Sequence, residues 1–205
     1  MTTTGKSSSA TAGAPSSGSG QQRSRRKTRE EVLADFENDL VRFEAMSIKI
    51  AGFDEPLEFS RTMDPMPQRL HFILPEYSIY NLTVRYKVKQ RPLRVLTYHQ
   101  TVKRKGIPVD DRNLHMIEDA WVNKHGDDGD YHEVTFPPSG VPGGSFLRGD
   151  YKAKSVVKEE GRLIWSYKWT LEVVKKGVKP SIGGFDDELE EGEGEGEDED
   201  VVMSK

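Results

Sequence analysis

The stretch that decides the fold is "IWSYKWTLEVVKK", residues 164–176, close to the end of the chain. Large apolar side chains occupy every second position, and polar ones lie between them; the apolar set is Trp165, Tyr167, Trp169, Leu171 and Val173. A period of two places alternate side chains on opposite faces of a strand. The stretch therefore predicts a strand with one buried face and one solvated face.

The same alternation recurs through the middle of the chain. Further segments rich in strand-forming residues are 46–50, 57–59, 80–88, 95–102, 131–136 and 151–157. Turns rich in Pro and Gly separate them, for example "PPSGVPGG" at 137–144. Seven or so short strands of this kind predict an all-β fold, an antiparallel β-sandwich.

A different pattern precedes the strands, in "TREEVLADFENDLVRF" at 28–43. Thr28 followed by Glu31 three residues later is a capping box, which starts helices. The apolar residues after it are spaced roughly as on a helix, so one amphipathic helix is expected over 28–43. Its apolar face either covers the protein's own core or is offered to a partner.

Charge is distributed unevenly. Residues 1–29 contain six Lys or Arg and no acid, whereas residues 186–205 contain eleven Asp or Glu and one Lys. Segments of this composition cannot bury a core, so residues 1–27 and 181–205 are expected to be disordered tails around a sandwich at 44–180. The basic run 23–29 is a solvated cluster, a nuclear address or a site for an anionic partner.

Catalytic patterns are missing from the sequence. It has no cysteine, and the five histidines, at 71, 99, 115, 125 and 132, show no metal-ligand spacing. "GGSFLRG" at 143–149 lacks the Lys-Ser/Thr of a phosphate loop. We therefore expect no enzyme, no cofactor and no metal. No apolar run suits a signal peptide or a membrane span, so a soluble, cytoplasmic protein is expected, and Arg148-Gly149-Asp150 is interpreted as a turn and not as an adhesion signal.

The aromatic stripe at 165–169 has two interpretations. Ordinary core packing is one. The other is a lipid pocket, because the strand before the stripe presents the small residues Ala153 and Ser155 at inward positions. Large rings that face small side chains could leave room for an apolar guest between the sheets.

Four blocks, in order, resemble the Rho GDP-dissociation inhibitor family. They are "HFILPEYSIYNLTVRYKV" (71–88), "VLTYHQTVKRKGIPVDD" (95–111), "VPGGSFLRGDYKAKS" (141–155) and "IWSYKWTLEVVKK" (164–176). The resemblance implies an immunoglobulin-like sandwich that binds prenylated Rho-type small GTPases, shields the isoprenyl group (geranylgeranyl or farnesyl) between its sheets, extracts the GTPase from membranes and slows GDP release. Contact with membranes would be transient, and no nucleic acid is expected.

The resemblance also implies site residues. The lipid slot would be lined by Phe72, Tyr80, Pro92, Leu96, Ala153, Tyr167 and Trp169. Pro92 and Ala153 stand where the family usually has aliphatic residues, and Tyr167 replaces a tryptophan, which predicts a reshaped slot. Partner-binding residues would be Asp110, near the GTPase's C-terminal segment, together with Asp35 and Phe36 of the arm.

Departures from the family leave alternatives open. The family's N-terminal arm is a helical hairpin, but here one helix is expected. An acidic tail follows the sandwich; it would pair with a polybasic run of the GTPase, or with Arg23–Arg29 of the same chain. One alternative function is a general prenyl or acyl-protein shuttle like the phosphodiesterase delta subunit. The other is an acidic-tailed histone-type chaperone.

Overall fold

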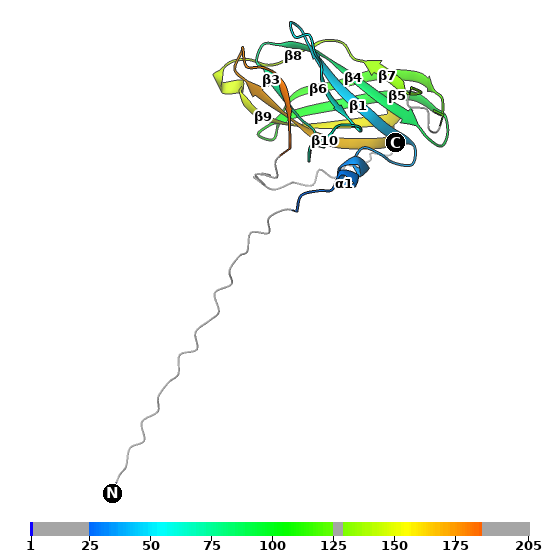
Figure 1. Cartoon of the computed structure of the whole chain (residues 1–205), viewed down its shortest axis with the longest axis horizontal. Coiled ribbons are helices and arrows are strands. Elements are labelled where there is room, and N and C mark those ends of the chain that lie inside the picture. Colours follow the sequence, from blue (N-terminus) through cyan, green and yellow to red (C-terminus); the bar gives the residue numbers. More distant parts are fainter. Residues whose placement is uncertain (2–24, 125–128, 186–205) are drawn as a thin grey trace, which may run out of the picture.

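The computed structural model describes Met1 and residues 25–124 and 129–185. These residues form two β-sheets stacked face to face, with one short helix, α1 (Arg29–Ala34), beside them (Figure 1). The predicted all-β sandwich is confirmed, with one difference. β10 pairs β3 in parallel, so the sheets are not purely antiparallel.

The two sheets differ in size. The five-stranded sheet consists of β2 (Leu57–Ser60), β1 (Val41–Ile50), β4 (Ile79–Val88) and β7 (His132–Thr135) in spatial order, with β8 (Ser139–Gly140) also paired to β4. The six-stranded sheet consists of β11 (Ser181–Gly183), β3 (His71–Pro75), β10 (Arg162–Val174), β9 (Gly149–Glu159), β5 (Leu93–Arg104) and β6 (Ile107–Ala120). The predicted 181 boundary is thus too early, because β11 continues the sandwich.

The helix predicted over 28–43 is wrong in its extent. Thr28 caps α1 through the expected capping box, but α1 ends at Ala34 and β1 begins at Val41. Asn38 is the physical reason, because its side-chain oxygen accepts hydrogen bonds from the backbone N–H groups of Leu40 and Val41. Such a local turn competes with helix and starts the strand instead.

The long connection between β7 and β9 is fastened by Glu76. Its carboxylate accepts hydrogen bonds from Gly144 N (2.8 Å), Arg148 Nη2 (2.7 Å) and Lys176 N (3.2 Å). The bonds from Arg148 and Gly144 lower the pKa of Glu76 from 4.5 to about 2. Arg148 of the Arg-Gly-Asp tripeptide is therefore held in an ion pair, and Gly149 adopts φ +108°, a backbone conformation that favours glycine.

Candidate functional site

The candidate site is the interface between the two sheets. Six of the predicted slot residues belong to one buried cluster there: Phe72, Tyr80, Leu96, Ala153, Tyr167 and Trp169. Pro92 is exposed on the connection between β4 and β5, so the structure does not bring it together with the others. The alternation of β4, β9 and β10 places these side chains inward, as the period-two pattern predicts.

Aromatic rings fill much of this interface. Trp165 of β10 stacks on Phe43 of β1 with ring centroids 3.9 Å apart, which joins the two sheets. Trp169 meets Phe72 edge to face at 5.9 Å. Tyr167 lies between the two tryptophans on the same face, 4.3 Å from the Trp165 ring. Contacts of this kind make the aromatic stripe part of the core.

A cluster of polar atoms is buried next to the stripe; we call Tyr98, Gln100, Ser155, Tyr167 and Trp169 the tyrosine cluster. Ser155 Oγ lies 2.5 Å from the Tyr98 hydroxyl and accepts a hydrogen bond from Trp169 Nε1 at 2.9 Å. Tyr98 also donates to Gln100 Oε1 at 3.3 Å. Burial raises the pKa of Tyr98 to about 12 and that of Tyr167 well above its ordinary value, so the cluster is neutral at working pH.

The part of the interface beside Phe36 and Tyr167 is closely packed in this conformation. A pocket lined by Phe36, Phe43, Met46, Phe59 and Tyr167, among others, has a volume of about 10 Å³. That is room for about one water molecule, whereas ligand pockets usually enclose about 300 Å³ or more. The space expected opposite Ser155 is occupied here, because the Tyr98 hydroxyl and Trp169 Nε1 both lie within hydrogen-bond distance of Ser155 Oγ.

Nearly all hydrogen bonds of the tyrosine cluster stay within one sheet. Tyr98, Ser155 and Trp169 lie on β5, β9 and β10, which are neighbours in the six-stranded sheet. Across to the five-stranded sheet, the contacts include the stacking of Tyr98 on Phe136, the ring of Tyr167 against Phe43 at 5.7 Å, and a weak bond from the Tyr167 hydroxyl to Met46 Sδ at 3.4 Å. Separating the sheets would therefore break apolar contacts while leaving the strong hydrogen bonds of the cluster intact.

Asp110 lies at one edge of this interface. Arg112 Nε donates to Asp110 Oδ2 at 2.6 Å, and Arg112 Nη2 donates to the Tyr80 hydroxyl of the opposite sheet at 3.1 Å. The Asp110 side chain keeps 38% of its surface exposed. The structure therefore places Asp110 beside a polar link between the sheets and leaves its carboxylate accessible.

The short arm contains the other two predicted partner residues, Asp35 and Phe36. Phe36 is buried against Phe59 and Tyr167, with ring centroids 4.9 Å and 5.7 Å away. Its ring offers no surface to a partner while the sandwich stays closed. Asp35 is exposed and bonds Lys27 Nζ at 2.8 Å. Of the two possibilities for the apolar face of this segment, the structure supports covering the protein's own core.

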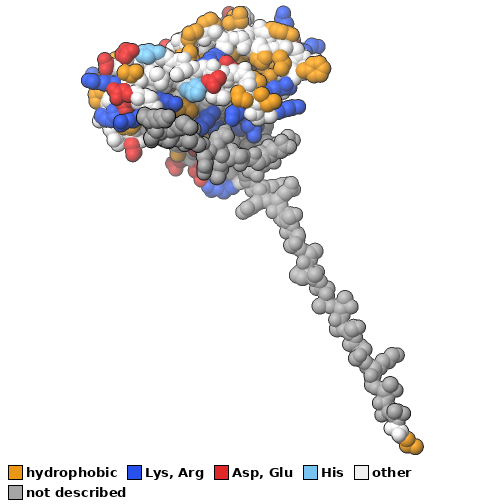
Figure 2. All heavy atoms as spheres, turned by 180° about the vertical axis from the view of Figure 1, so that it is seen from behind, with side chains coloured by type: hydrophobic (Ala, Val, Ile, Leu, Met, Phe, Trp, Pro, Cys, Tyr) orange, Lys and Arg blue, Asp and Glu red, His pale blue; other side chains and the backbone are white. Residues whose placement is uncertain are grey.

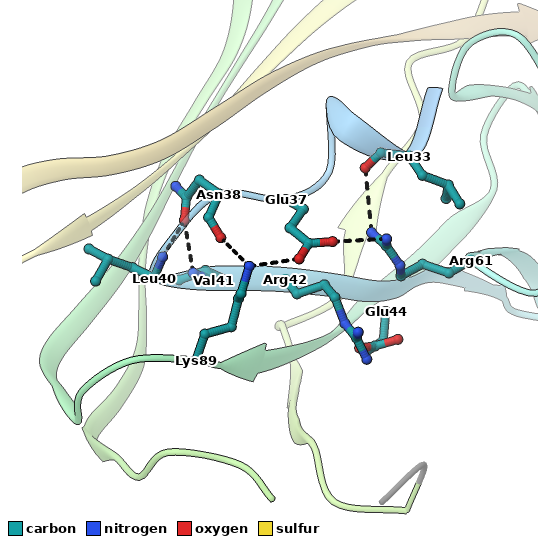
Figure 3. Close-up of polar contacts among 9 residues, drawn as sticks. All are labelled: Leu33, Glu37, Asn38, Leu40, Val41, Arg42, Glu44, Arg61 and Lys89. Carbon is teal, nitrogen blue, oxygen red and sulfur yellow. Dashed lines mark hydrogen bonds and ion pairs between the residues drawn. The ribbon is translucent and has the colours of Figure 1, made fainter. Parts of the chain in front are cut away.

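A charged cluster holds the arm against the five-stranded sheet (Figure 3). Glu37 accepts hydrogen bonds from Lys89 Nζ at 2.7 Å and from Arg61 Nη2 at 3.0 Å. Partial burial opposes ionisation, but the bond and charge of Lys89 and the charge of Arg61 hold the pKa of Glu37 below its ordinary value. Glu37, Arg61 and Lys89 thus tie the turn after α1 to β4 and to the end of β2.

The sequence patterns missed Tyr98, Gln100 and Arg112. The sequence does contain a signal for Tyr98 and Gln100. Every second residue of β5 is buried, and this alternation places a glutamine inward next to a tyrosine; the buried positions are Leu96, Tyr98, Gln100 and Val102. Within residues 25–124 and 129–185, no three His, Asp or Glu side chains gather as a metal site. Over the same ranges, no helix is long and apolar enough to cross a membrane.

Comparison with a family model and with curated proteins points to the same family. The pattern of the family described as "RHO protein GDP dissociation inhibitor" matches residues 25–176. A Rho GDP-dissociation inhibitor from Saccharomyces cerevisiae is 30% identical over 125 residues, which cover 59% of this chain and 60% of that protein. One from Schizosaccharomyces pombe is 25% identical over 105 residues, which cover 51% of this chain and 48% of that protein. The matched segments thus span about half to three fifths of these relatives.

Proposed function

This chain belongs to the Rho protein GDP dissociation inhibitor family, and from that premise we propose that it is a cytoplasmic, non-enzymatic carrier of prenylated Rho-type small GTPases. It shields the isoprenyl chain between its two sheets, withdraws the GTPase from membranes and slows the release of GDP. Slowed GDP release rests on family membership, since the described arm contains one six-residue helix.

One observation carries the lipid-binding part of the proposal. The strong hydrogen bonds of the tyrosine cluster lie within the six-stranded sheet, and what crosses to the other sheet is almost entirely apolar. An isoprenyl chain could therefore replace these apolar contacts without unpairing the strong hydrogen bonds of the tyrosine cluster. Removing such a chain from a bilayer costs about 0.8 kcal/mol per CH₂, and the apolar interface between the sheets offsets that cost.

The test is titration of the full chain with a fluorescent geranylgeranyl-cysteine methyl ester. We expect saturable binding, with a change in the intrinsic fluorescence of the buried Trp165 and Trp169. The double variant Tyr167→Ser/Trp169→Ser should lose binding, and Leu163→Ser, at an exposed position of the same strand, should keep it. Since the double variant could unfold, circular dichroism is compared first, and Ala153→Leu serves as a milder obstruction. A folded wild type that does not bind would refute the proposal.

The short described arm favours a second candidate, a general shuttle for prenylated or acylated proteins. Such a carrier would recognise the lipid without the body of the GTPase. Affinities for a geranylgeranylated C-terminal peptide and for the whole prenylated GTPase distinguish the two functions. Equal affinities would support the shuttle, and tighter binding of the whole GTPase would support the inhibitor. The tails that suggested a histone-type chaperone lie almost wholly outside the described residues.

A further inference from the structure

Exposed apolar side chains gather at one end of the sandwich. We call this the Phe146 end and define it by the turns 76–79, 103–109, 144–148 and 175–179. The large apolar residues exposed there are Tyr77, Ile79, Ile107, Val109, Phe146, Leu147 and Val178. Phe146 has 88% of its surface exposed and Ile107 has 68%. Exposed apolar side chains that gather in one place often mark an interaction site, whereas single scattered ones do not.

Hydrogen bonds and an ion pair hold these four turns together. Glu76 links the first turn to Arg148 in the third and to Lys176 N in the fourth. Arg104 of the second turn donates to the backbone oxygen of Arg148 at 2.8 Å. The apolar tips are therefore presented by one connected structure and not by four independent loops.

The tips are also held outward. The Tyr77 ring lies so close to Gly143 that a Cβ there would sit 2.2 Å from a ring carbon. Tyr77 itself has φ +62°, which is unfavourable for a non-glycine residue. Leu147 is fixed from behind, since its backbone oxygen accepts a hydrogen bond from the Tyr151 hydroxyl. An exposed aromatic ring kept in a strained conformation is typical of functional surfaces.

Basic residues surround the apolar tips. The turns 103–109, 144–148 and 175–179 contain seven Lys or Arg and no Asp or Glu, which makes this surface attractive to anions. Lys105, Lys175, Lys176 and Lys179 are exposed. Glu76, the acid of the remaining turn, is neutralised by Arg148. Figure 2 shows orange and blue side chains side by side at the end of the molecule drawn on the right.

We propose that the Phe146 end docks on the surface of an anionic lipid bilayer. Phe146 and Ile107 enter the boundary between headgroups and acyl chains, and the surrounding Lys and Arg side chains contact lipid phosphates. Apolar residues at the tips of turns, ringed by cations, suit an interface of this chemistry. A protein partner would instead call for a contiguous patch of about 800 Å² per side.

The inference deepens the proposed function, because a carrier that withdraws a prenylated protein must approach the membrane. Tyr80 and Arg112, which bridge the two sheets, lie close in sequence to the turns 76–79 and 103–109. Docking through the Phe146 end would therefore bring this edge of the interface between the sheets toward the bilayer. Docking on a bilayer needs no GTPase, so vesicle binding can be measured separately from the binding of the prenylated GTPase.

The first experiment is flotation of the full chain with phosphatidylcholine vesicles containing about one third phosphatidylserine, at low and physiological salt. Phe146→Ser/Ile107→Ser should weaken binding about tenfold or more, because two apolar side chains no longer insert. Lys175→Gln/Lys176→Gln should weaken binding to anionic vesicles, with little change on pure phosphatidylcholine. Leu163 is 63% exposed and lies at the start of β10, at the end of the sandwich opposite the Phe146 end. Leu163→Ser should therefore bind as the wild type does.

A second measurement locates the contact. Because the chain contains no cysteine, Phe146→Cys and Leu163→Cys can each carry a single environment-sensitive fluorophore. Addition of anionic vesicles should shift the emission to the blue at position 146 and leave position 163 unchanged. This readout does not depend on the basic run 23–29, which could bind anionic vesicles by itself.

Three results would overturn the proposal. They are no vesicle binding by the folded wild type, binding that the Phe146→Ser/Ile107→Ser variant retains in full, or equal emission shifts at positions 146 and 163. If that variant weakens association with the GTPase while the wild type ignores vesicles, the surface serves a protein partner instead. Failure of vesicle binding together with saturable prenyl binding would refute the docking surface and leave the proposed function standing.

Discussion

Two clusters of polar side chains in this protein differ in charge, in burial and in the elements that they join. The tyrosine cluster is neutral, fully buried and bonded mainly within the six-stranded sheet. The cluster of Glu37, Arg61 and Lys89 is charged, partly exposed and ties the arm to the five-stranded sheet. In the proposed carrier, the first would keep one wall of the predicted slot rigid while the sheets separate, and the second would hold in place the segment that contains the buried Phe36. The interior cluster should therefore dominate stability, and the surface cluster should respond to salt and pH.

The largest effect is expected from Trp169→Ala, which removes both a core ring and a member of the tyrosine cluster. We expect the free energy of unfolding to fall by about 3–5 kcal/mol, as for other large-to-small changes of buried aromatic residues. Urea denaturation measures it. Trp121→Ala, at an exposed tryptophan, is the control and should cost below about 1 kcal/mol. Similar losses in the two variants would show that the cluster is not special.

Ser155→Ala tests the hydrogen bonds without removing a ring. Its hydroxyl serves both Tyr98 and Trp169, so the change leaves the Trp169 N–H buried without its acceptor. We expect a loss of about 1–3 kcal/mol in the free energy of unfolding. Ser166→Ala, on the exposed face of β10, should be within about 0.5 kcal/mol of the wild type.

A pair of tyrosines sharpens the comparison further. The Tyr98 hydroxyl is hydrogen-bonded, whereas the buried Tyr86 hydroxyl has no partner among the described residues. Tyr98→Phe should therefore cost about 1 kcal/mol, while Tyr86→Phe should be neutral or stabilising. Thermal unfolding of the two variants side by side provides the measurement. Equal losses would mean that the Tyr86 hydroxyl is satisfied in solution.

The smallest effect is expected from Glu37→Gln in the charged cluster. The loss should be below about 1 kcal/mol and should shrink as salt is added. Because the folded pKa of Glu37 is lowered, its contribution is present above 4.5 and is lost as the pH falls through the lowered value. The difference in stability between wild type and variant, followed from neutral pH into acid, should therefore vanish. A difference that persists in acid would contradict an electrostatic origin.

The sequence predicted the inward-facing residues of the alternating strands well. β4, β9 and β10 bury every second side chain, and the period of two shows this directly. β6 was missed as a strand because it is an edge strand with most side chains exposed, so apolar and polar residues do not alternate along its sequence. The arm was mistaken for a longer helix because one polar side chain, Asn38, decides where the strand begins.

Whether the predicted lipid slot is open or filled could not be predicted from sequence patterns. Small residues at 153 and 155 were compatible with either an open space or a filled one. The structure fills it with Tyr98, whose hydroxyl reaches Ser155 from the neighbouring strand. Such a contact depends on the register between strands whose contacting residues lie 57 positions apart in the sequence, which local periodicity does not encode.

Gln68 has a consequence for the two charged tails. Its side-chain oxygen accepts a hydrogen bond from Lys27 N at 2.7 Å, and its own N–H donates to the backbone oxygen of Gly184 at 2.6 Å. The basic run and the acidic tail, which lie at opposite ends of the sequence, therefore start from one place on the surface. Chain connectivity then gives each tail an effective concentration near the other, of order millimolar for short flexible links. If the acidic tail pairs with the basic run of the same chain, an outside partner of either tail would have to compete with a ligand that is covalently attached.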